Sequence, residues 1–201
     1  MAEVRQRIVM RVSRQKAAEN RERIIDVAGA LFREKGFDGI GVADIMKAAQ
    51  LTHGGFYGHF ASKDDLVAQA SQRAMARAAM NWTNVTAGAP KNPYAALLEH
   101  YLSPRHRDDP GDGCAFAALS GEAARYGRPV RSAFARGLGP LIEIIANAVP
   151  GRSKSGRRRK AVAAVAELVG ALMLARAVDD PALSNEILDA AKQELLAAAN
   201  R

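Results

Sequence analysis

Apolar side chains recur three or four residues apart along most of the chain, which is the spacing of an amphipathic helix. One such stripe follows Asn20, a residue that can cap a helix, and ends at Gly36, a typical stop. A shorter stripe covers 42–49, and Thr52 can cap a third helix over 53–60. Two short helices joined by a tight turn predict a helix-turn-helix.

The rest of the chain continues the same pattern in longer segments. Helices are expected over 62–84, 94–102, 114–125, 129–149, 158–178 and 182–199. The segment 103–113, rich in Pro, Gly and Asp, is predicted to be a loop, and 150–160 a basic connector. No stretch alternates as a strand does. We therefore predict an all-α fold of about nine helices, with a basic arm (1–19), a head (20–66) and a larger body (67–201).

Composition supports helices and adds a charge. The chain is 48% hydrophobic but only 5% aromatic, and its surplus of alanine and leucine favours helix over strand. With 29 Lys and Arg against 21 Asp and Glu, the net charge is +8. That surplus indicates an anionic partner, nucleic acid or a membrane surface. From charge alone, a soluble basic protein with no such partner is an equal alternative.

The single cysteine, Cys114, excludes an intramolecular disulfide and gives no sign of secretion. The longest apolar stretch, 161–178, is interrupted by two charges, so a cytoplasmic protein is expected. No phosphate-binding loop, nucleophile elbow or metal-ligand pair occurs, and His53 and His59 fall on different helix faces. We expect no enzyme, cofactor or metal. A helical enzyme or ligand carrier that does not bind DNA remains the rival class.

The stretch QLTHGGFYGHFASKDDL, residues 50–66, carries the strongest functional signal. Phe56 and Phe60 share one helix face and can pack on the head. The glycines at 54, 55 and 58 leave the other face low enough for a backbone to approach DNA. The polar tips on that face belong to Thr52, His53, Tyr57, His59 and Lys63. The alternative is a glycine-rich loop tucked beneath two helices, with ordinary core His and Tyr.

Residues 20–66 closely resemble the DNA-binding head of the TetR (tetracycline repressor-like) family of bacterial transcription regulators. The matching residues are an Arg-x-x-Ile-x-x-x-Ala-x-x-x-Phe run from Arg21, then Gly36-Phe37, Asp44-Ile45, Ala49 and the series Phe56-Tyr57-x-x-Phe60-x-x-Lys63-x-x-Leu66. They cover about a quarter of the chain. Two positions depart from the family: Gln50 replaces the usual turn glycine, and Gly41 replaces a capping serine or threonine.

The resemblance implies a homodimer that binds a palindromic double-stranded DNA operator and responds to a small molecule. It implies phosphate contacts from Thr52, Tyr57 and Lys63, and groove-facing positions at His53, Gly54, Gly55 and His59. We hypothesise that the basic arm, including Arg14 and Lys16, enters a neighbouring minor groove. Alternatively, the arm is a tail that adds only nonspecific charge.

For the body, the resemblance implies that the last two helices pair two protomers. The candidate interface is Val162, Val165, Val169, Leu172, Ile187, Leu188, Ala191 and Leu195; these residues can equally complete a monomeric core. The candidate lining of a site for an apolar or aromatic effector is Met80, Trp82, His100, Tyr101, Cys114, Phe116, Phe134 and Met173. Cys114, expected at a helix start, can sense electrophiles or oxidants, or can be a small buried hydrophobe.

Overall fold

A computed structural model describes the backbone of residues 2–200 and the side chains of residues 14–199. Its helices are α1 (Ala2–Lys35), α2 (Val42–Ala48), the 3₁₀-helix η1 (His53–Gly58), α3 (Lys63–Gly88), α4 (Pro93–Tyr101), α5 (Pro104–Asp108), α6 (Ala115–Ala123), α7 (Arg128–Ala148), α8 (Lys154–Ala177) and α9 (Pro181–Asn200). This part of the chain contains no strand, which confirms the predicted all-α fold.

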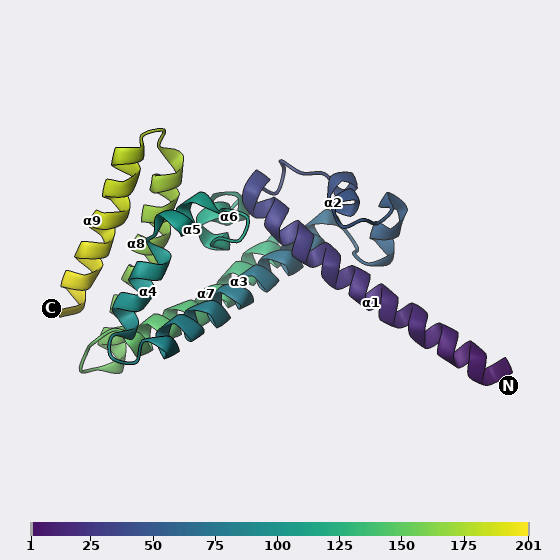
Figure 1. Ribbon diagram of the computed structural model, residues 1–201, viewed down its shortest axis with the longest axis horizontal. Coiled ribbons are helices and arrows are strands. Elements are labelled where there is room, and N and C mark those ends of the chain that lie inside the picture. Colours follow the sequence, from purple (N-terminus) through teal and green to yellow (C-terminus); the bar gives the residue numbers. More distant parts are fainter. Residues whose placement is uncertain (1, 201) are drawn as a thin grey trace.

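The head is built from the second half of α1, α2 and η1, packed against the start of α3 (Figure 1). Its core is apolar, with Phe32, Phe56 and Phe60 buried together. The turn between α2 and η1 is made by Gln50 at φ +58°, so this residue takes the left-handed conformation that more often falls to glycine. Gly41 begins α2 without a side-chain cap, which costs only a few tenths of a kcal/mol, about what is expected when glycine replaces a capping residue.

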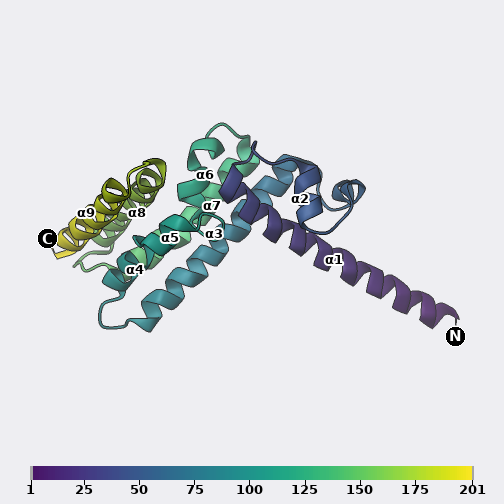
Figure 2. The same ribbon diagram turned by 45° about the horizontal axis from the view of Figure 1, so that its top comes forward.

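The body is a layer of long helices in which α3 and α7 lie side by side (Figures 1 and 2). Both helices start near the head. Tyr126, just before α7, lies close enough to Asp64, at the start of α3, for that carboxylate to act on its pKa. Further along the two helices, Gly137 of α7 faces Met75 of α3. α8 and α9 form a pair at the end of the body far from α1 (Figure 2). The boundary that we predicted at residue 66 falls inside α3, so one helix belongs to both regions.

Three predicted boundaries are wrong. α1 begins at Ala2 rather than near Asn20, so residues 2–19 continue the helix; the arm's side chains before Arg14 lie outside the described residues. The predicted loop 103–113 contains α5, because Ser103 caps it by accepting a hydrogen bond from the His106 N–H and Pro104 suits its first turn. The basic connector is mostly the start of α8, which Ser153 caps in the same way.

None of the described helices is long and apolar enough to cross a lipid bilayer.

Candidate DNA interface and internal cavity

The predicted contact segment lies on the surface of the head. Tyr57 is 71% exposed, and Thr52, His53 and Gly54 are exposed beside it. Phe56 is fully buried, so η1 is anchored by its phenylalanine while its other face meets solvent. The arrangement leaves the polar face of η1 available to a large partner.

The glycines of η1 are not required by the fold. A Cβ built at Gly54 or Gly58 meets no atom within 4 Å, and one at Gly55 meets only ordinary contacts, with Met46 Cε 3.7 Å and Thr52 Oγ1 3.8 Å away. None of these three residues has the left-handed φ that favours glycine. They leave the surface of η1 low, with room above it for side chains that the chain does not supply.

Polar groups around η1 are left uncommitted. The Thr52 side chain occupies the N-cap position but accepts no capping hydrogen bond, whereas Ser62 accepts one from the Asp65 N–H at 3.1 Å. Lys63, partly exposed at the start of α3, has no ion pair among residues 14–199. His59 is half-buried against Phe60. These groups surround one exposed face.

Arg14 and Lys16 lie exposed on α1, on a helix rather than a separate arm. Lys16 forms a 3.9 Å ion pair with Glu19. At such exposure a pair of this kind stabilises the fold by at most about 1 kcal/mol, so it does not prevent either cation from contacting DNA.

Polar contacts tie α1 to α3. Arg73 on α3 bonds Asp26 at 3.2 Å and also Glu22, both on α1. The Arg21 guanidinium lies 5.1 Å from the centre of the Phe60 ring and hydrogen-bonds Gln69. These links hold α1, and Phe60 after η1, against the start of α3.

A second set of contacts holds the end of α1 to the body. The Phe37 N–H donates to Glu122 Oε2 at 2.7 Å, and the Tyr126 hydroxyl donates to Asp38 Oδ1 at 2.6 Å. Burial raises the pKa of Tyr126, and its hydrogen bond to Asp38 raises it further, so the phenol remains a donor. Gly36 has φ +79°, and a Cβ there would lie 2.5 Å from the Glu122 carboxylate. Only glycine fits at position 36. The contacts of Gly36, Phe37 and Asp38 with Glu122 and Tyr126 are called the head–body clasp below.

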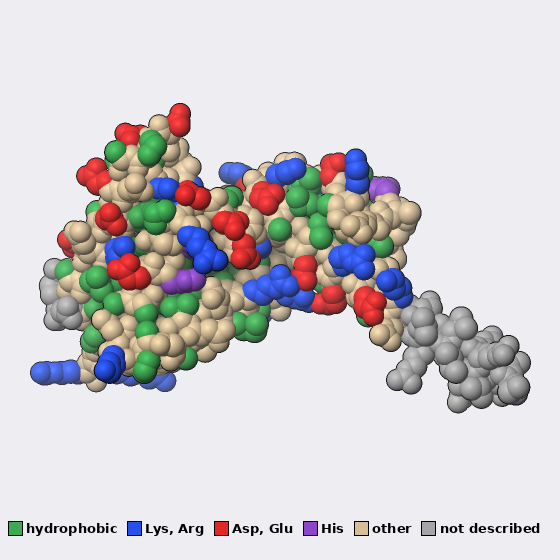
Figure 3. All heavy atoms as spheres, viewed as in Figure 1, with side chains coloured by type: hydrophobic (Ala, Val, Ile, Leu, Met, Phe, Trp, Pro, Cys, Tyr) green, Lys and Arg blue, Asp and Glu red, His purple; other side chains and the backbone are tan. Residues whose placement is uncertain are grey.

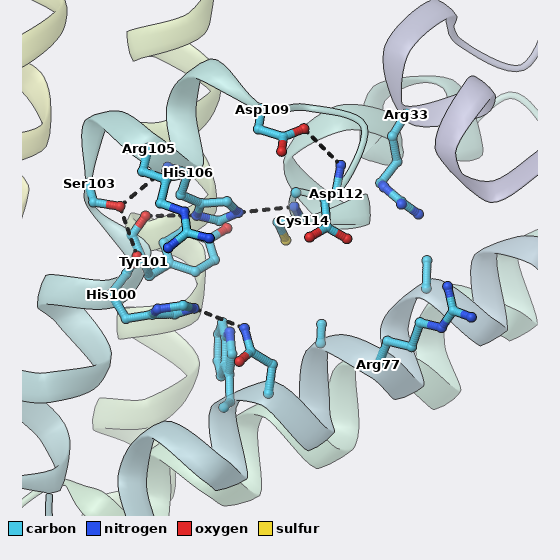
Figure 4. Close-up of a pocket in the computed structure, with 15 residues that line it drawn as sticks. Arg33, Arg77, His100, Tyr101, Ser103, Arg105, His106, Asp109, Asp112 and Cys114 are labelled. Atoms are coloured by element: carbon cyan, nitrogen blue, oxygen red, sulfur yellow. Dashed lines mark hydrogen bonds between the residues drawn. The ribbon is translucent and has the colours of Figure 1, made fainter. Parts of the chain in front are cut away.

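Beside the clasp, the protein has a cavity of about 480 Å³ that is partly open to solvent, between α1, α3, α4, α5 and the loop before α6 (Figure 4). Four predicted effector residues line it: Trp82, His100, Tyr101 and Cys114. Four do not. Met80 is 65% exposed because it lies two residues from Trp82, on the opposite face of α3. Met173 is 39% exposed, and Phe116 and Phe134 pack on one another in the core.

The cavity wall is more polar than we expected. It includes six charged or titratable residues that the sequence analysis did not predict: Arg33, Arg77, Arg105, His106, Asp109 and Asp112. Most of these belong to 103–113, where Ser103-Pro104 was the available sign of a short helix. Acidic and basic side chains gather over the junction of α1 and the body (Figure 3). Ligands with polar groups therefore suit this cavity.

His106 organises the closed end of the cavity. Its Nδ1 bonds the Tyr101 carbonyl oxygen at 2.8 Å, which makes Nδ1 the protonated nitrogen. Its Nε2 then accepts from the Cys114 N–H at 3.1 Å. Burial lowers the pKa of His106, which favours this neutral form. Cys114 is thereby held as the N-cap of α6 with its side chain in the cavity wall.

The predicted dimer residues divide into two groups. Val165, Leu172, Leu188 and Leu195 are buried inside the protomer, as the alternative that they complete its own core requires. They face inward because they lie on the sides of α8 and α9 that pack together and onto the body. Val162 is exposed, and Val169, Ile187 and Ala191 are half-buried. Met173, Leu174 and Leu183 add exposed apolar surface to the same two helices.

Comparison with known proteins agrees with this architecture. Residues 24–70 match the family of bacterial regulatory proteins, tetR family. The chain is 41% identical over 59 residues to the HTH-type transcriptional regulator AcrR of Shigella flexneri, a match over 29% of this chain and 27% of AcrR. It is 25% identical over 134 residues to the HTH-type transcriptional repressor NemR of Escherichia coli K12, a match over 65% of this chain and 67% of NemR.

Solved structures extend the likeness along the chain. A TetR transcriptional regulator from Chloroflexus aurantiacus has a TM-score of 0.76 at 25% identity, over 93% of this chain and 97% of that one. The reduced form of E. coli NemR has a TM-score of 0.74 at 22% identity, over 88% and 95%. Residues 24–70 therefore carry the helix-turn-helix of the tetR family of bacterial regulatory proteins, and the chain as a whole has the fold of TetR-family transcription regulators.

Proposed function

We propose that the protein is a homodimeric repressor that leaves a palindromic operator when a small effector with an aromatic part enters the cavity. The observation that carries this proposal is the position of the cavity: its wall includes Arg33 of α1 and the loop that leads into α6. α6 also carries Glu122, which holds the start of the α1–α2 loop. An effector there touches the segments that orient the head.

On the DNA side, the exposed face of η1 lies along the major groove in this proposal. Thr52, Tyr57 and Lys63 contact phosphates, and His53, Gly54, Gly55 and His59 face the bases. Arg14 and Lys16 contact the backbone or minor groove beside that site. The free Thr52 hydroxyl and the exposed Tyr57 ring support these roles.

Two protomers pair through the apolar side chains of α8 and α9 that are exposed or half-buried in the protomer, namely Val162, Val169, Met173, Leu174, Leu183, Ile187 and Ala191. These two helices lie at the end of the body away from α1 (Figure 2). A symmetric pair of heads then matches two operator half-sites.

The test selects a duplex from a randomised DNA pool with the wild-type protein and compares variants on it. We expect Tyr57→Ala and Lys63→Ala each to weaken binding about tenfold with unchanged circular dichroism, because both side chains lie outside the core. A matched control is Lys91→Ala, which removes another exposed cation. Selection of no duplex, or equal affinity of all variants, would count against the proposal.

A second candidate function is thiol sensing by Cys114. It is favoured by the place of Cys114 in the cavity wall and at the start of α6, where a group attached to sulfur would disturb the clasp. The NemR structure named as a reduced form belongs to a relative, and it adds support. The test is release of the selected duplex by iodoacetamide. Cys114→Ser is expected to abolish release of the duplex by iodoacetamide and to keep release by other effectors. A variant that is still released by iodoacetamide but no longer by other effectors excludes thiol sensing.

A further inference from the structure

Two arginines near the cavity lack a carboxylate partner. Arg33 donates through Nε, at 2.9 Å, and through Nη2 to one acceptor, the carbonyl oxygen of Gly111. Arg176 donates to the carbonyl oxygens of Arg107, at 3.0 Å, and His106, at 2.6 Å. Within residues 14–199 neither forms an ion pair. Burial lowers the pKa of both, the sign of a charge held in a poorly solvated place.

Polar donors at the closed end lack strong acceptors. Tyr101 is only 1% exposed, and its hydroxyl lies beside the Cys114 side chain, a weak acceptor, with no other hydrogen-bond partner among the described residues. Arg176 Nη1, behind the wall, has no partner there either. In Figure 4 the Tyr101 ring points toward Cys114 along the cavity. Burial raises the pKa of Tyr101, so the hydroxyl keeps its proton. A buried donor of this kind normally has an acceptor.

The acidic residues of the wall do not remove this excess of positive charge. Asp109 and Asp112 are exposed, and Asp109 Oδ1 accepts from the Asp112 N–H at 3.1 Å. Asp112 lies in electrostatic range of Arg33 without forming an ion pair with it. Arg105 is exposed at the cavity as a further cation, with no ion pair among the described side chains.

We propose that the effector is an aromatic carboxylate whose carboxylate lies beside Cys114, accepts a hydrogen bond from Tyr101 and is stabilised by Arg33 and Arg176. Trp82, whose ring centre lies 5.5 Å from that of Tyr101 in an edge-on arrangement, forms the wall for the aromatic part of the effector. The inference rests on the proposed function and names its ligand class. It also gives Arg33 a regulatory role, since Arg33 lines the cavity from α1.

The experiment uses matched acids and amides, namely benzoate with benzamide, cinnamate with cinnamamide and 2-naphthoate with 2-naphthamide. Calorimetry and thermal shift measure binding to the full chain without DNA. At least one acid is expected to bind about tenfold more tightly than its amide, because hydrogen bonds to a charged group are stronger than those to a neutral one. A set in which no acid exceeds its amide overturns the proposal.

Variants locate the effect. Arg33→Gln and Tyr101→Phe are each expected to reduce the acid-to-amide ratio at least threefold, and Arg33→Lys to restore part of it. The control Arg159→Gln removes an exposed cation of α8 and leaves the ratio unchanged. A ratio that survives both substitutions overturns the proposal. If Arg33→Gln does not fold, Tyr101→Phe decides, since it removes one hydroxyl from an otherwise intact ring.

The readouts separate this inference from the proposed function. Binding of the selected duplex by the free protein tests the regulator without any acid. A protein that binds DNA but prefers no carboxylate retains the proposed function and loses the inference. A protein that prefers carboxylates but binds no duplex loses the proposed function.

Discussion

Gly54→Ala separates the needs of the fold from those of DNA binding. No atom lies within 4 Å of a Cβ at this position, and the backbone is not left-handed, so alanine fits without strain. A compatible Gly→Ala change stabilises a protein by about 0.4–1 kcal/mol, mainly by restricting the unfolded chain. Urea denaturation should therefore show equal or higher stability.

The same methyl group points into the space that we assign to the duplex. Forcing one extra methyl into a close-packed contact costs about 1–3 kcal/mol, which is roughly 5- to 150-fold in the dissociation constant. Fluorescence anisotropy with the selected duplex measures this loss. The control is Gly121→Ala on α6, where the Cβ also meets nothing within 4 Å but lies away from η1. Unchanged affinity of Gly54→Ala would refute the close approach of η1 to DNA.

Three further predictions concern charge, pH and association. In a salt titration of the selected duplex, Lys63→Gln should make the negative slope of log K against log salt shallower by about 0.9, the value for one phosphate contact. An unchanged slope removes Lys63 from the interface. Because the pKa of His106 is lowered on folding, the unfolded chain binds more protons below about pH 6.5, so stability should fall as pH drops through that value. Thermal melts at pH 5.5 and 7.5 should show a smaller pH effect in His106→Gln, and an equal effect would contradict this assignment. Leu174→Glu, at an exposed position on α8, should yield monomers in sedimentation without loss of helix. The control Leu172→Ala, in the core, should instead destabilise the fold by about 2–5 kcal/mol. Persistent dimers in Leu174→Glu would place the interface elsewhere.

The sequence predicted the helical head well because its signals are local. Phe56 and Phe60 four apart, a possible cap at Thr52 and a stop at Gly36 each depend on a few neighbouring residues. The short helix at 53–58 is nevertheless of the 3₁₀ type, with the Gly55 N–H bonded to the Thr52 carbonyl oxygen at 3.1 Å.

The cavity was harder to predict, because its wall depends on which face of each helix turns inward. Met80 and Trp82 have similar apolar character, yet only Trp82 faces the cavity. Arg33 reaches the cavity wall from α1, which ends 45 positions before Met80 in the sequence, and no local pattern indicates that contact. The pairing of α8 and α9 raises the same difficulty, since a wide apolar stripe does not say which part faces the protomer's own core.

The continuity of α3 has a mechanical consequence. Its 26 residues form one rod of about 39 Å at 1.5 Å per residue. If one end is taken as the pivot, a tilt of about 5° moves the other end by roughly 3 Å, an amount comparable to the length of a hydrogen bond. Arg73 ties α1 to this rod, so the first helix travels with it. In the proposed function, a tilt of this size is thus large enough to take a side chain out of reach of a phosphate.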